Sequence, residues 1–425
     1  MGFVDELKWR GLLHDLMPGT AELLDKGLVS GYIGFDPTAD SLHIGNLVPI
    51  MLLVHFQKFG HKPFALVGGA TGMVGDPSGK TQERQLLTVE TINHNLTCQK
   101  KQLEQFLDFN CGNNSAEIVN NYDWFKDFSF LDFIRDVGKH ITVNYMMAKD
   151  SVKNRLEDGM SFTEFSYQLV QGYDFYYLFK NKNCKLQMGG SDQWGNITTG
   201  TELIRRMSGG EAYAITAPLV KKADGSKFGK SEGGNIWLDK NKTSPYKFFQ
   251  FWLNTSDEDI KSYIRTFSLL NKSDIEKLEL EHSASPHERL LQKTLAEELT
   301  QRVHSKEDLQ KAKNASEILF GNATKSALEN LSDTDFIDVF SGVEQSLVPK
   351  NSLDVEVDIV DFLSEISKFL SSRGESRRAL VENSICVNKE KVTEGYKISS
   401  KDLINDKFIL LQRGKKKYFL VKLED

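Results

Sequence analysis

The feature that most constrains the fold is a strand, a helix and a strand in succession near the start of the chain. Leu28 to Phe35 is an apolar run of strand length, and Asp36 to Ser41 is rich in turn-forming residues. Gly45 to Phe59 has helical length and ends at Gly60, and Pro63 to Val67 is a second apolar run. Such a βαβ unit requires two parallel strands joined by a right-handed crossover. We therefore predict an α/β, Rossmann-like domain with a parallel sheet, a fold that binds nucleotides.

The chain has 425 residues, which is enough for two or three domains. Helix-start signals follow the first domain at Ser244-Pro245, at Ser273-x-x-Glu276 and at Ser285-Pro286-x-Glu288, and they predict an α-helical domain. Between Gly321 and Asn351 the sequence is polar and poorly periodic, as expected of a connector.

The last part of the chain predicts a small α+β unit with a basic surface. An apolar-periodic stretch from Ile359 to Leu370 precedes a short helix with three arginines, and Val387-Asn388-Lys389 predicts a hairpin. Clustered cations suit a phosphate backbone. The predicted boundaries are 1–222 for the Rossmann-like domain, 223–244 for a loop and linker, 245–322 for the helical domain, 323–352 for a linker and 353–425 for the small unit.

Composition excludes several classes of protein. The four cysteines are scattered without metal-ligand or disulfide spacing, which argues against a zinc site or a disulfide framework and predicts a reduced, cytoplasmic compartment. The net charge of −6 argues against a protein that is basic throughout. The longest apolar stretch, Val48 to Val54, is too short to span a membrane, and Met1 to Trp9 does not resemble an export signal.

The first predicted helix opens with His43-Ile44-Gly45-Asn46. A helix start presents unpaired backbone N–H groups and the positive end of the helix dipole, and both attract anions. His43 would add a side-chain donor, and Gly45 would let the backbone approach a ligand closely. Taken alone, the segment favours the alternative, an ordinary capped helix whose histidine has no ligand.

A glycine-rich run from Val67 to Lys80 follows the second strand. Three residues separate Gly75 from Gly79, where a phosphate-binding P-loop needs four, so we reject the P-loop interpretation. Glycines at a strand end can still let the backbone approach a ligand at the carboxyl edge of the sheet. The alternative is a turn-rich connection, and the density of glycine favours a ligand.

Tyr167, Gln171 and Asp174 share one face of the helix that Ser161 opens, because they are spaced at i, i+4 and i+7. A polar stripe on an otherwise apolar helix needs partners, either within the protein as a hydrogen-bond network or from a ligand at a pocket wall. Asp192 follows another predicted strand, Lys185 to Met188, and could accept ribose hydroxyls. A capped helix start at Asn196 is the alternative.

The segment from Asp224 to Ser231 contains Lys227 and Lys230 with glycines on both sides. A solvated surface loop is the most common explanation for such a segment. The functional explanation is a closing loop whose ammonium groups neutralise charge that develops on a pyrophosphate leaving group.

Together these segments resemble the class I aminoacyl-tRNA synthetases, whose signatures are His-Ile-Gly-His and Lys-Met-Ser-Lys-Ser, and most closely the bacterial tyrosine-specific family. The segments Gly31 to Thr38, Gly68 to Lys80 and Gly190 to Gly195 also match motifs of that family. The tail resembles the RNA-binding domain of ribosomal small-subunit protein four. Two departures stand out: Asn46 replaces the second histidine, and Phe228-Gly229 replaces Met-Ser, with Lys227 and Lys230 still in register.

The resemblance implies an ATP-dependent ligase that joins tyrosine to ATP, releases pyrophosphate, and transfers the tyrosyl group to the 3′-terminal adenosine of tRNA(Tyr). It also implies Mg²⁺ held through the ATP phosphates, no metal site in the protein, and a homodimer with a contact around Ile141 to Met147. The implied catalytic residues are His43, Asn46, Lys80, Arg84, Lys227, Lys230 and Ser231. Tyrosine would contact Tyr32, Asp76, Tyr167, Gln171, Asp174 and Gln193. ATP would contact Gly34, Asp36, His43, Gly45, Asn46, Gly190, Asp192 and Lys230, and tRNA would contact Arg373, Arg377, Arg378 and Lys389.

Two alternatives stay open at this point. One is a related adenylate-forming synthetase for another aromatic amino acid, above all tryptophan. The other is a catalytically inactive RNA-binding protein with the synthetase fold, which Asn46 alone supports. Tyr32 with Asp174 favours a phenol-bearing substrate, because a buried site committed to a hydroxyl leaves polar groups unpaired when that hydroxyl is missing.

Overall fold

The computed structural model describes residues 2–78, 87–149, 152–153, 159–226, 228–231, 234–320, 325–340, 343–414 and 417–424. The chain divides into two compact units. The first comprises Met1–Asp239 and Thr255–Val303, and the second comprises Lys240–Asn254 and His304–Asp425. Among the described residues, no helix is long and apolar enough to cross a membrane.

The first unit is built on a five-stranded sheet in the order β3-β2-β1-β4-β5, and every neighbouring pair is parallel. The strands are β1 (Ser30–Phe35), β2 (Lys62–Val67), β3 (Glu117–Asn120), β4 (Cys184–Gly190) and β5 (Tyr213–Ala217). The chain runs outward from β1 through β2 to β3 and then returns to the other side of β1 at β4. This reversal of strand order confirms the predicted Rossmann-like fold and marks the place where such sheets bind ligands.

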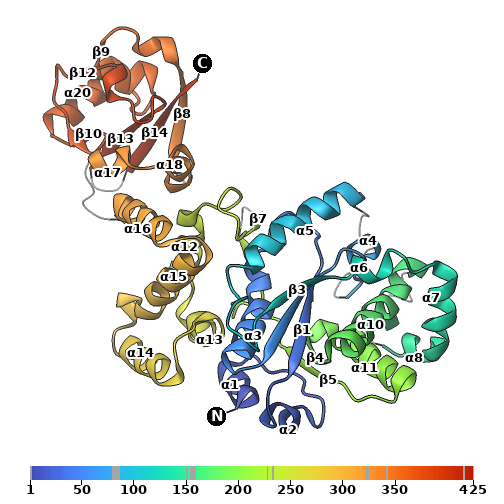
Figure 1. Cartoon of the computed structure of the whole chain (residues 1–425). Helices are drawn as coiled ribbons and strands as arrows, with labels where there is room; N and C mark the ends of the chain where they lie inside the picture. The colour runs from blue at the N-terminus through green and yellow to red at the C-terminus, as the bar shows by residue number, and fades with distance from the viewer. Residues whose placement is uncertain are drawn as a thin grey trace. The chain divides into compact units, whose positions relative to one another are not determined.

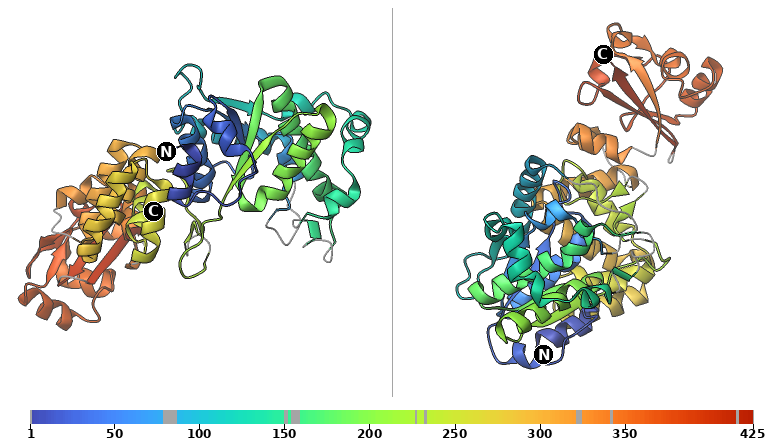
Figure 2. Two further views of the ribbon diagram at one scale, coloured as in Figure 1. Left: turned by 90° about the horizontal axis from the view of Figure 1, so that it is seen from below. Right: turned by 90° about the vertical axis from the view of Figure 1, so that its right-hand side faces the viewer.

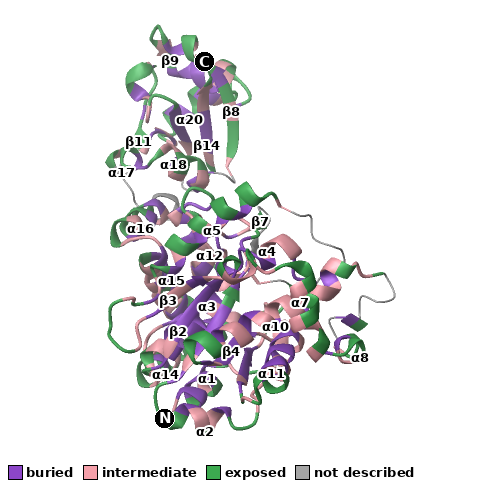
Figure 3. Ribbon diagram, turned by 45° about the vertical axis from the view of Figure 1, so that its right-hand side comes forward, coloured by how far each residue is buried: buried purple, intermediate pink, exposed green. Residues whose placement is uncertain are grey.

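Helices cover both faces of the sheet. Successive residues of a strand point to opposite faces, so neighbouring residues of β1 contact different helices. On β1, a Cβ added to Gly31 would lie 2.9 Å from the ring of Phe56 in α3 (Leu47–Lys58). The next residue, Tyr32, packs its ring 5.4 Å from the ring of Phe175 in α10 (Phe162–Lys182). Figure 1 shows α3 on one side of the strands and α10 on the other, and Figure 3 shows α3 and β2 largely buried.

The predicted βαβ unit is confirmed in detail. A short 3₁₀ turn, Ile44–Asn46, precedes α3, and Gly60 after the helix has a φ of +85°, a conformation that favours glycine. The remaining helices of this part of the unit are α1 (Phe3–Arg10), α2 (Thr20–Asp25), α4 (Thr71–Val74), α5 (Val89–Leu103), α6 (Tyr122–Phe125), α7 (Phe130–Asp136), α8 (Val143–Met147) and α11 (Trp194–Ser208). Two short antiparallel strands of two residues each, β6 (Lys230–Ser231) and β7 (Gly234–Asn235), follow β5.

Three helices from later in the chain belong to the first unit: α13 (Asp257–Phe267), α14 (Lys272–Ala284) and α15 (Leu290–Val303). The guanidinium of Arg10 in α1 anchors the end of α13 and the turn after it, since it donates to the carbonyls of Arg265 and Ser268 at 2.8 Å and to that of Leu270 at 2.7 Å. The residues expected to form one helical domain, 245–322, are therefore divided between the two units.

The second unit combines helices with a five-stranded sheet in the order β11-β10-β13-β14-β8. Figure 2 shows these strands in the orange to red part of the chain. Its helices are α12 (Pro245–Leu253), α16 (Lys306–Phe320), α17 (Lys325–Glu329), α18 (Asp333–Val339), α19 (Ile359–Asp361) and α20 (Arg373–Val381). Its strands are β8 (Glu344–Pro349), β9 (Val357–Asp358), β10 (Ile385–Val387), β11 (Glu390–Lys391), β12 (Lys397–Ile398), β13 (Phe408–Arg413) and β14 (Lys417–Glu424).

Some local predictions were wrong. Residues 323–352, expected to be a connector, contain α17, α18 and β8, because Leu328, Phe336 and Phe340 are fully buried in an apolar cluster. Ser273 does not start a helix, since Asn271 caps α14 two residues earlier by accepting from the backbone of Asp274. Ser285 precedes only a 3₁₀ turn and forms no side-chain cap. The start at Ser244 is confirmed, because its hydroxyl accepts from the backbone N–H of Lys247.

Candidate active site

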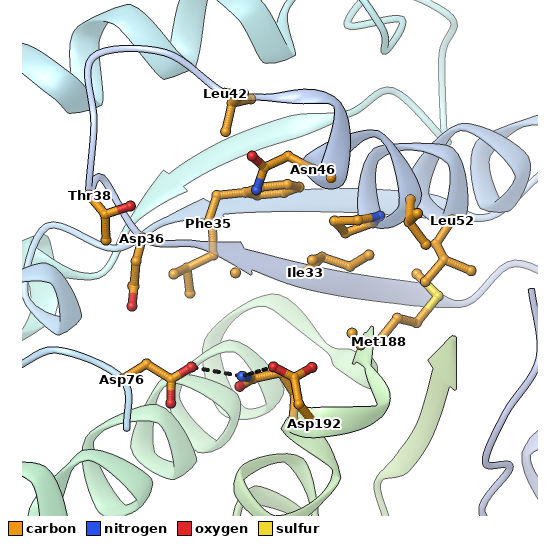
Figure 4. Close-up of a pocket in the computed structure, with 18 of the residues that line it drawn as sticks. Ile33, Phe35, Asp36, Thr38, Leu42, Asn46, Leu52, Asp76, Met188 and Asp192 are labelled. Carbon is orange, nitrogen blue, oxygen red and sulfur yellow. Dashed lines mark hydrogen bonds between the residues drawn. The ribbon is translucent and has the colours of Figure 1, made fainter. Parts of the chain in front are cut away.

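A cavity of about 680 Å³ opens at the carboxyl ends of β1 and β4, where the strand order reverses. Figure 4 shows strands and loops from both halves of the sheet converging on it. The predicted site residues that line this cavity are Tyr32, Gly34, Asp36, His43, Gly45, Asn46, Asp76, Tyr167, Gln171, Asp174, Gly190, Asp192 and Gln193. Residues from separate motifs thus share one cavity.

The other predicted site residues are not in this cavity's described lining. Lys80, Arg84 and Lys227 lie outside the described residues. Lys230 and Ser231 form β6, but only their backbone is described. The predicted tRNA-binding residues belong to the second unit.

Tyr32 and Asp174 form a buried polar wall of the cavity. Tyr32 is 1% exposed, and its hydroxyl has no hydrogen-bond partner among the described residues. Asp174 is also 1% exposed and accepts from Trp124 Nε1 at 2.9 Å and from Asn121 Nδ2 at 3.1 Å, each on a different carboxyl oxygen. Burial raises the pKa of Asp174 to about 8, although these two hydrogen bonds act to lower it.

Three more polar atoms on residues that line the cavity have no partner among the described residues: Oε1 of Gln99, of Gln171 and of Gln187. Gln187 is paired in register with Tyr32 across β1 and β4. A buried polar atom without a partner costs about 1–3 kcal/mol, so native proteins rarely leave several in one place. Their concentration here indicates a polar ligand.

Asp36 connects the end of β1 to α10 and α4. Its carboxylate accepts from the Tyr167 hydroxyl at 2.8 Å and from the Thr71 hydroxyl at 2.7 Å. Gly68 leaves the room that this arrangement needs, because an added Cβ would lie 2.2 Å from Asp36 Oδ1. Burial, with the charge of Asp36, raises the pKa of Tyr167 well above its usual value, so the hydroxyl remains a neutral donor.

Figure 4 shows Asp76 and Asp192 close together on one side of the cavity, and Gln193 lies within hydrogen-bonding distance of both. Gln193 Nε2 donates to Asp76 Oδ2 at 2.7 Å and approaches Asp192 Oδ2 at 3.4 Å. Asn196 Nδ2 is 3.4 Å from Asp76 Oδ1. Burial and the charge of Asp76 raise the pKa of Asp192. This end of the cavity is therefore suited to a cationic group and to hydroxyls that donate hydrogen bonds.

His43 and Asn46 form a capping box at the start of the 3₁₀ turn. The His43 backbone N–H donates to Asn46 Oδ1 at 3.0 Å, and the Gly45 backbone N–H donates to His43 Nδ1 at 3.0 Å. Because Nδ1 accepts, a neutral His43 ring carries its proton on Nε2. The Asn46 amide nitrogen makes no hydrogen bond to any residue that the structure describes. Two neutral donors therefore lie at this turn.

Sequence reasoning missed three groups that complete the site: Asn121, Trp124 and Gln187. No motif marks Asn121 or Trp124. Both follow β3 and contact Asp174, which lies about fifty positions later in the chain. Trp124 is held by stacking on Tyr177, with ring centroids 4.4 Å apart. Gln187 could have been found as a polar residue inside the predicted strand Lys185 to Met188.

Comparisons with known proteins agree with this geometry. The family "tRNA synthetases class I (W and Y)" matches residues 26–321, and the "Tyrosine--tRNA ligase SYY-like C-terminal domain" matches residues 336–421. A tyrosine--tRNA ligase of Flavobacterium psychrophilum is 62% identical, and one of Bacteroides fragilis is 58% identical, each over 99% of both chains. A C-terminally truncated mitochondrial tyrosyl-tRNA synthetase of Aspergillus nidulans has a similar structure, with a TM-score of 0.68 and 31% identity over 75% of this chain and 94% of that one.

The first family spans the sheet, the cavity and the helices α13 to α15, and the second spans most of the β-rich second unit. The family predicted from the sequence motifs is thereby confirmed, and the chain belongs to the class I tRNA synthetases of the tryptophan and tyrosine family.

Proposed function

We propose that this enzyme activates L-tyrosine with ATP and transfers the tyrosyl group to tRNA(Tyr). The tyrosine--tRNA ligase activity predicted from the sequence is the activity of the curated relatives that are 56–62% identical over nearly the whole chain. The observation that carries the proposal is the buried pair of Tyr32 and Asp174, one with an unpaired hydroxyl and one with a carboxyl group, on one cavity wall. A phenol hydroxyl is the group that this pair fits best.

The substrate phenol would donate to Asp174 and accept from the Tyr32 hydroxyl. Asn121 and Trp124 hold the carboxyl group in place from the side of the protein. Phenylalanine would leave both groups buried and unpaired, and tryptophan would not place an oxygen at this point. Selectivity for tyrosine thus rests on the penalty for unpaired polar groups.

The α-amino end of tyrosine would bind at the opposite, acidic part of the cavity. Asp76 supplies the negative charge that an ammonium group needs, and Gln193 orients that carboxylate with a hydrogen bond of 2.7 Å. Tyr167 and the unpaired Gln171 Oε1 lie on the same cavity. Tyrosine bound at both ends would present its carboxylate toward the ATP side.

The reaction needs no protein nucleophile. A carboxylate oxygen of tyrosine attacks the α-phosphorus of ATP, the bond to the bridging oxygen breaks, and pyrophosphate leaves with its electron pair. A ribose hydroxyl oxygen of the terminal adenosine of tRNA then bonds to the tyrosyl carbonyl carbon and loses its proton, while the bond from that carbon to the phosphate oxygen breaks and AMP leaves with the electron pair. His43 and Asn46 would donate to the phosphates, and Lys80, Arg84, Lys227, Lys230 and Ser231 would supply further charge and donors.

The nucleotide would bind at the switch point of the sheet. Gly34 and Gly190 lie at the ends of β1 and β4, where backbone can approach a ligand closely, and Asp36 and Asp192 supply acceptors for hydroxyls. Mg²⁺ would enter as MgATP and take its ligands from phosphate oxygens and water. Among the described residues, no cluster of three or more metal-ligating side chains occurs.

The second unit would hold tRNA through exposed and partly exposed cations. Arg373 is paired with Asp361 at 2.6 Å and Arg377 with Glu394 at 3.6 Å, while Lys389 donates to the Tyr418 hydroxyl at 2.7 Å. Ion pairs at an exposed surface are weak, so a phosphate can compete for these cations, and binding would fall with salt. Arg378 lies on the same helix and is exposed. A reaction that consumes ATP and tRNA would take place in the cytoplasm.

A homodimer would cover an apolar surface on α7, α8 and the start of α10. Leu131 is 77% exposed, and Phe130 and Phe162 are 62% and 66% exposed with ring centroids 6.5 Å apart. Val143 on α8 is also exposed, and it belongs to the predicted contact around Ile141 to Met147. Replacing Leu131 by Asp should convert the dimer to a monomer in light scattering, whereas a wild-type monomer would contradict the assignment.

The test of the proposed function is amino-acid-dependent exchange of labelled pyrophosphate into ATP, followed by aminoacylation of tRNA. Tyrosine should stimulate the exchange, while tryptophan and phenylalanine should not. Stimulation by tryptophan alone would overturn the proposal. Absence of exchange with every amino acid, in a protein that still binds tRNA, would instead support an inactive RNA-binding protein.

A further inference from the structure

One aromatic contact is not part of the cavity chemistry described above. Phe228, on the loop that follows β5, packs its ring against two aromatic residues of α13. Its centroid lies 5.1 Å from that of Tyr263 at an interplanar angle of 66°, and 5.4 Å from that of Phe267 at 12°. Phe228 is itself one position before Gly229 and two before Lys230.

The same helix also holds the start of this loop. Asp259 accepts from the backbone N–H of Ala223 at 2.8 Å, and the Tyr263 hydroxyl approaches the carbonyl of Lys221 at 3.5 Å. Three residues of α13, spaced within eight positions, therefore contact the loop between residues 221 and 228. A helix face that makes repeated contacts with one loop fixes the position of that loop relative to the helix.

The other side of the loop is bound to the His43 segment. The Ile236 N–H donates to the Gly229 carbonyl at 3.1 Å, and the Ile44 N–H donates to the Ile236 carbonyl at 2.9 Å. Gly229 has a φ of +84°, and an added Cβ would lie 3.1 Å from Ile44 Cγ1. The backbone of the loop thus passes against the phosphate-binding turn, with α13 behind it.

The helix that carries the aromatic contact is itself fixed to the sheet domain. Arg10 binds carbonyls at and beyond the end of α13, and Arg302 donates to the Phe267 carbonyl at 3.0 Å. Arg302 is also paired with Glu298, which accepts from the Leu269 N–H at 2.7 Å. The end of α13 therefore cannot shift without breaking several buried or partly buried hydrogen bonds.

We propose that Phe228 is a positioning residue, whose seat between Tyr263 and Phe267 holds the following loop residues at the phosphate end of the cavity for the activation step. The inference rests on the proposed function, because the loop has a role only where a phosphate leaving group must be stabilised. It assigns a part in the chemistry to α13, none of whose described residues lines the cavity. The contrary view is that Phe228 contributes only to stability.

The decisive measurement is steady-state pyrophosphate exchange with Phe228→Ala. The variant loses two aromatic pairs, so kcat should fall roughly 10- to 100-fold, which corresponds to about 1.4–2.7 kcal/mol. The KM for tyrosine should stay within about twofold, since Tyr32 and Asp174 lie on the sheet and α10. Phe228→Met, which keeps an apolar contact with the rings, should retain kcat within about fivefold.

Phe59→Ala is the matched control, because Phe59 is also half-buried and packs on one aromatic ring, that of Phe3 at 5.9 Å. It follows the far end of α3, about 18 Å from the His43 turn by the rise of a twelve-residue helix. Its kcat should be unchanged even where its melting temperature falls. A Phe228→Ala protein that loses stability but keeps its kcat would overturn the proposal.

A double-mutant cycle with Tyr263→Leu tests whether Phe228 and Tyr263 affect kcat through their mutual contact or independently of each other. The double variant should lose little more kcat than Phe228→Ala alone, because both changes remove the same contact. Multiplicative losses would overturn the proposal. If the wild-type protein shows no tyrosine-dependent exchange, the proposed function fails, whereas normal wild-type exchange with an unaffected Phe228→Ala variant rejects the positioning role by itself.

Discussion

Replacing Asp174 by Asn tests how the cavity distinguishes tyrosine from phenylalanine. The change keeps the shape of the side chain but replaces one carboxyl oxygen by an NH₂ group. Trp124 Nε1 and Asn121 Nδ2 now donate to different oxygens of Asp174, at 2.9 and 3.1 Å. An amide has one acceptor oxygen where the carboxylate has two, so one of these donors loses its acceptor, and the oxygen that remains is a neutral, weaker acceptor for the substrate phenol.

The expected loss follows from the acceptor that disappears. A hydrogen bond to a charged group contributes about 1.5–3 kcal/mol, so above pH 8, where Asp174 is ionised, kcat/KM for tyrosine should fall roughly 10- to 150-fold. Phenylalanine offers no hydroxyl to position 174, so its kcat/KM should change less than about threefold. The ratio of the two values, which measures selectivity, should therefore fall by about the same factor as tyrosine activation.

Pyrophosphate exchange gives both values of kcat/KM when each amino acid is varied at saturating ATP. Tyr173→Phe is a suitable control, because Tyr173 is the neighbouring residue on α10 but packs among Phe125, Phe128 and Phe133 outside the cavity. It should leave the selectivity ratio unchanged. Equal losses for tyrosine and phenylalanine in the Asp174→Asn protein would refute the reasoning, since they would show that Asp174 supports the fold and not the phenol.

Three further changes have outcomes that the structure predicts. Asp174 has a raised pKa of about 8, so it is mostly protonated below pH 8, and its ionised form is the stronger acceptor for the phenol. Tyrosine affinity should therefore increase from pH 6 to 8, by up to about tenfold per pH unit. Calorimetry with no such increase would contradict this. Asn46→Ala removes the acceptor for the His43 N–H, so kcat for exchange should fall about tenfold while the tyrosine KM is unchanged. Gly68→Ala forces a Cβ to within 2.2 Å of Asp36 Oδ1, so thermal unfolding should show a loss of about 1–3 kcal/mol.

The fold could be predicted where the signal is local. An apolar run of strand length, a turn and a capped helix determine β1, α3 and β2, because each is specified within about ten residues. Helix starts were less certain, since Asn271 and Ser273 are both good caps and only one can be used. The prediction of a connector was wrong because the apolar residues of α17 and α18 are buried against strands from later in the chain.

The site could be predicted where its residues share one helix face or one motif. Tyr167, Gln171 and Asp174 fall on the same cavity because their spacing puts them on one side of α10. Asn121 and Trp124 carry no such pattern, since their role depends on where β3 ends relative to α10 in space. The aromatic seat of Phe228 has the same origin: its partners come from a helix about forty positions later in the chain.

Asn46 can replace the histidine of the family signature because the side chain at this position needs one hydrogen-bond acceptor and one donor. It must accept from the His43 backbone N–H, and the amide does so with Oδ1 at 3.0 Å. It must also offer a donor, and the amide keeps Nδ2 for that purpose. A neutral histidine would meet the same two needs with its two ring nitrogens, but it could take up a proton near pH 6.5 and then lose its acceptor. The asparagine preserves the turn and the donor over a wider range of pH, so Asn46 is compatible with an active enzyme and gives the inactive alternative no physical support.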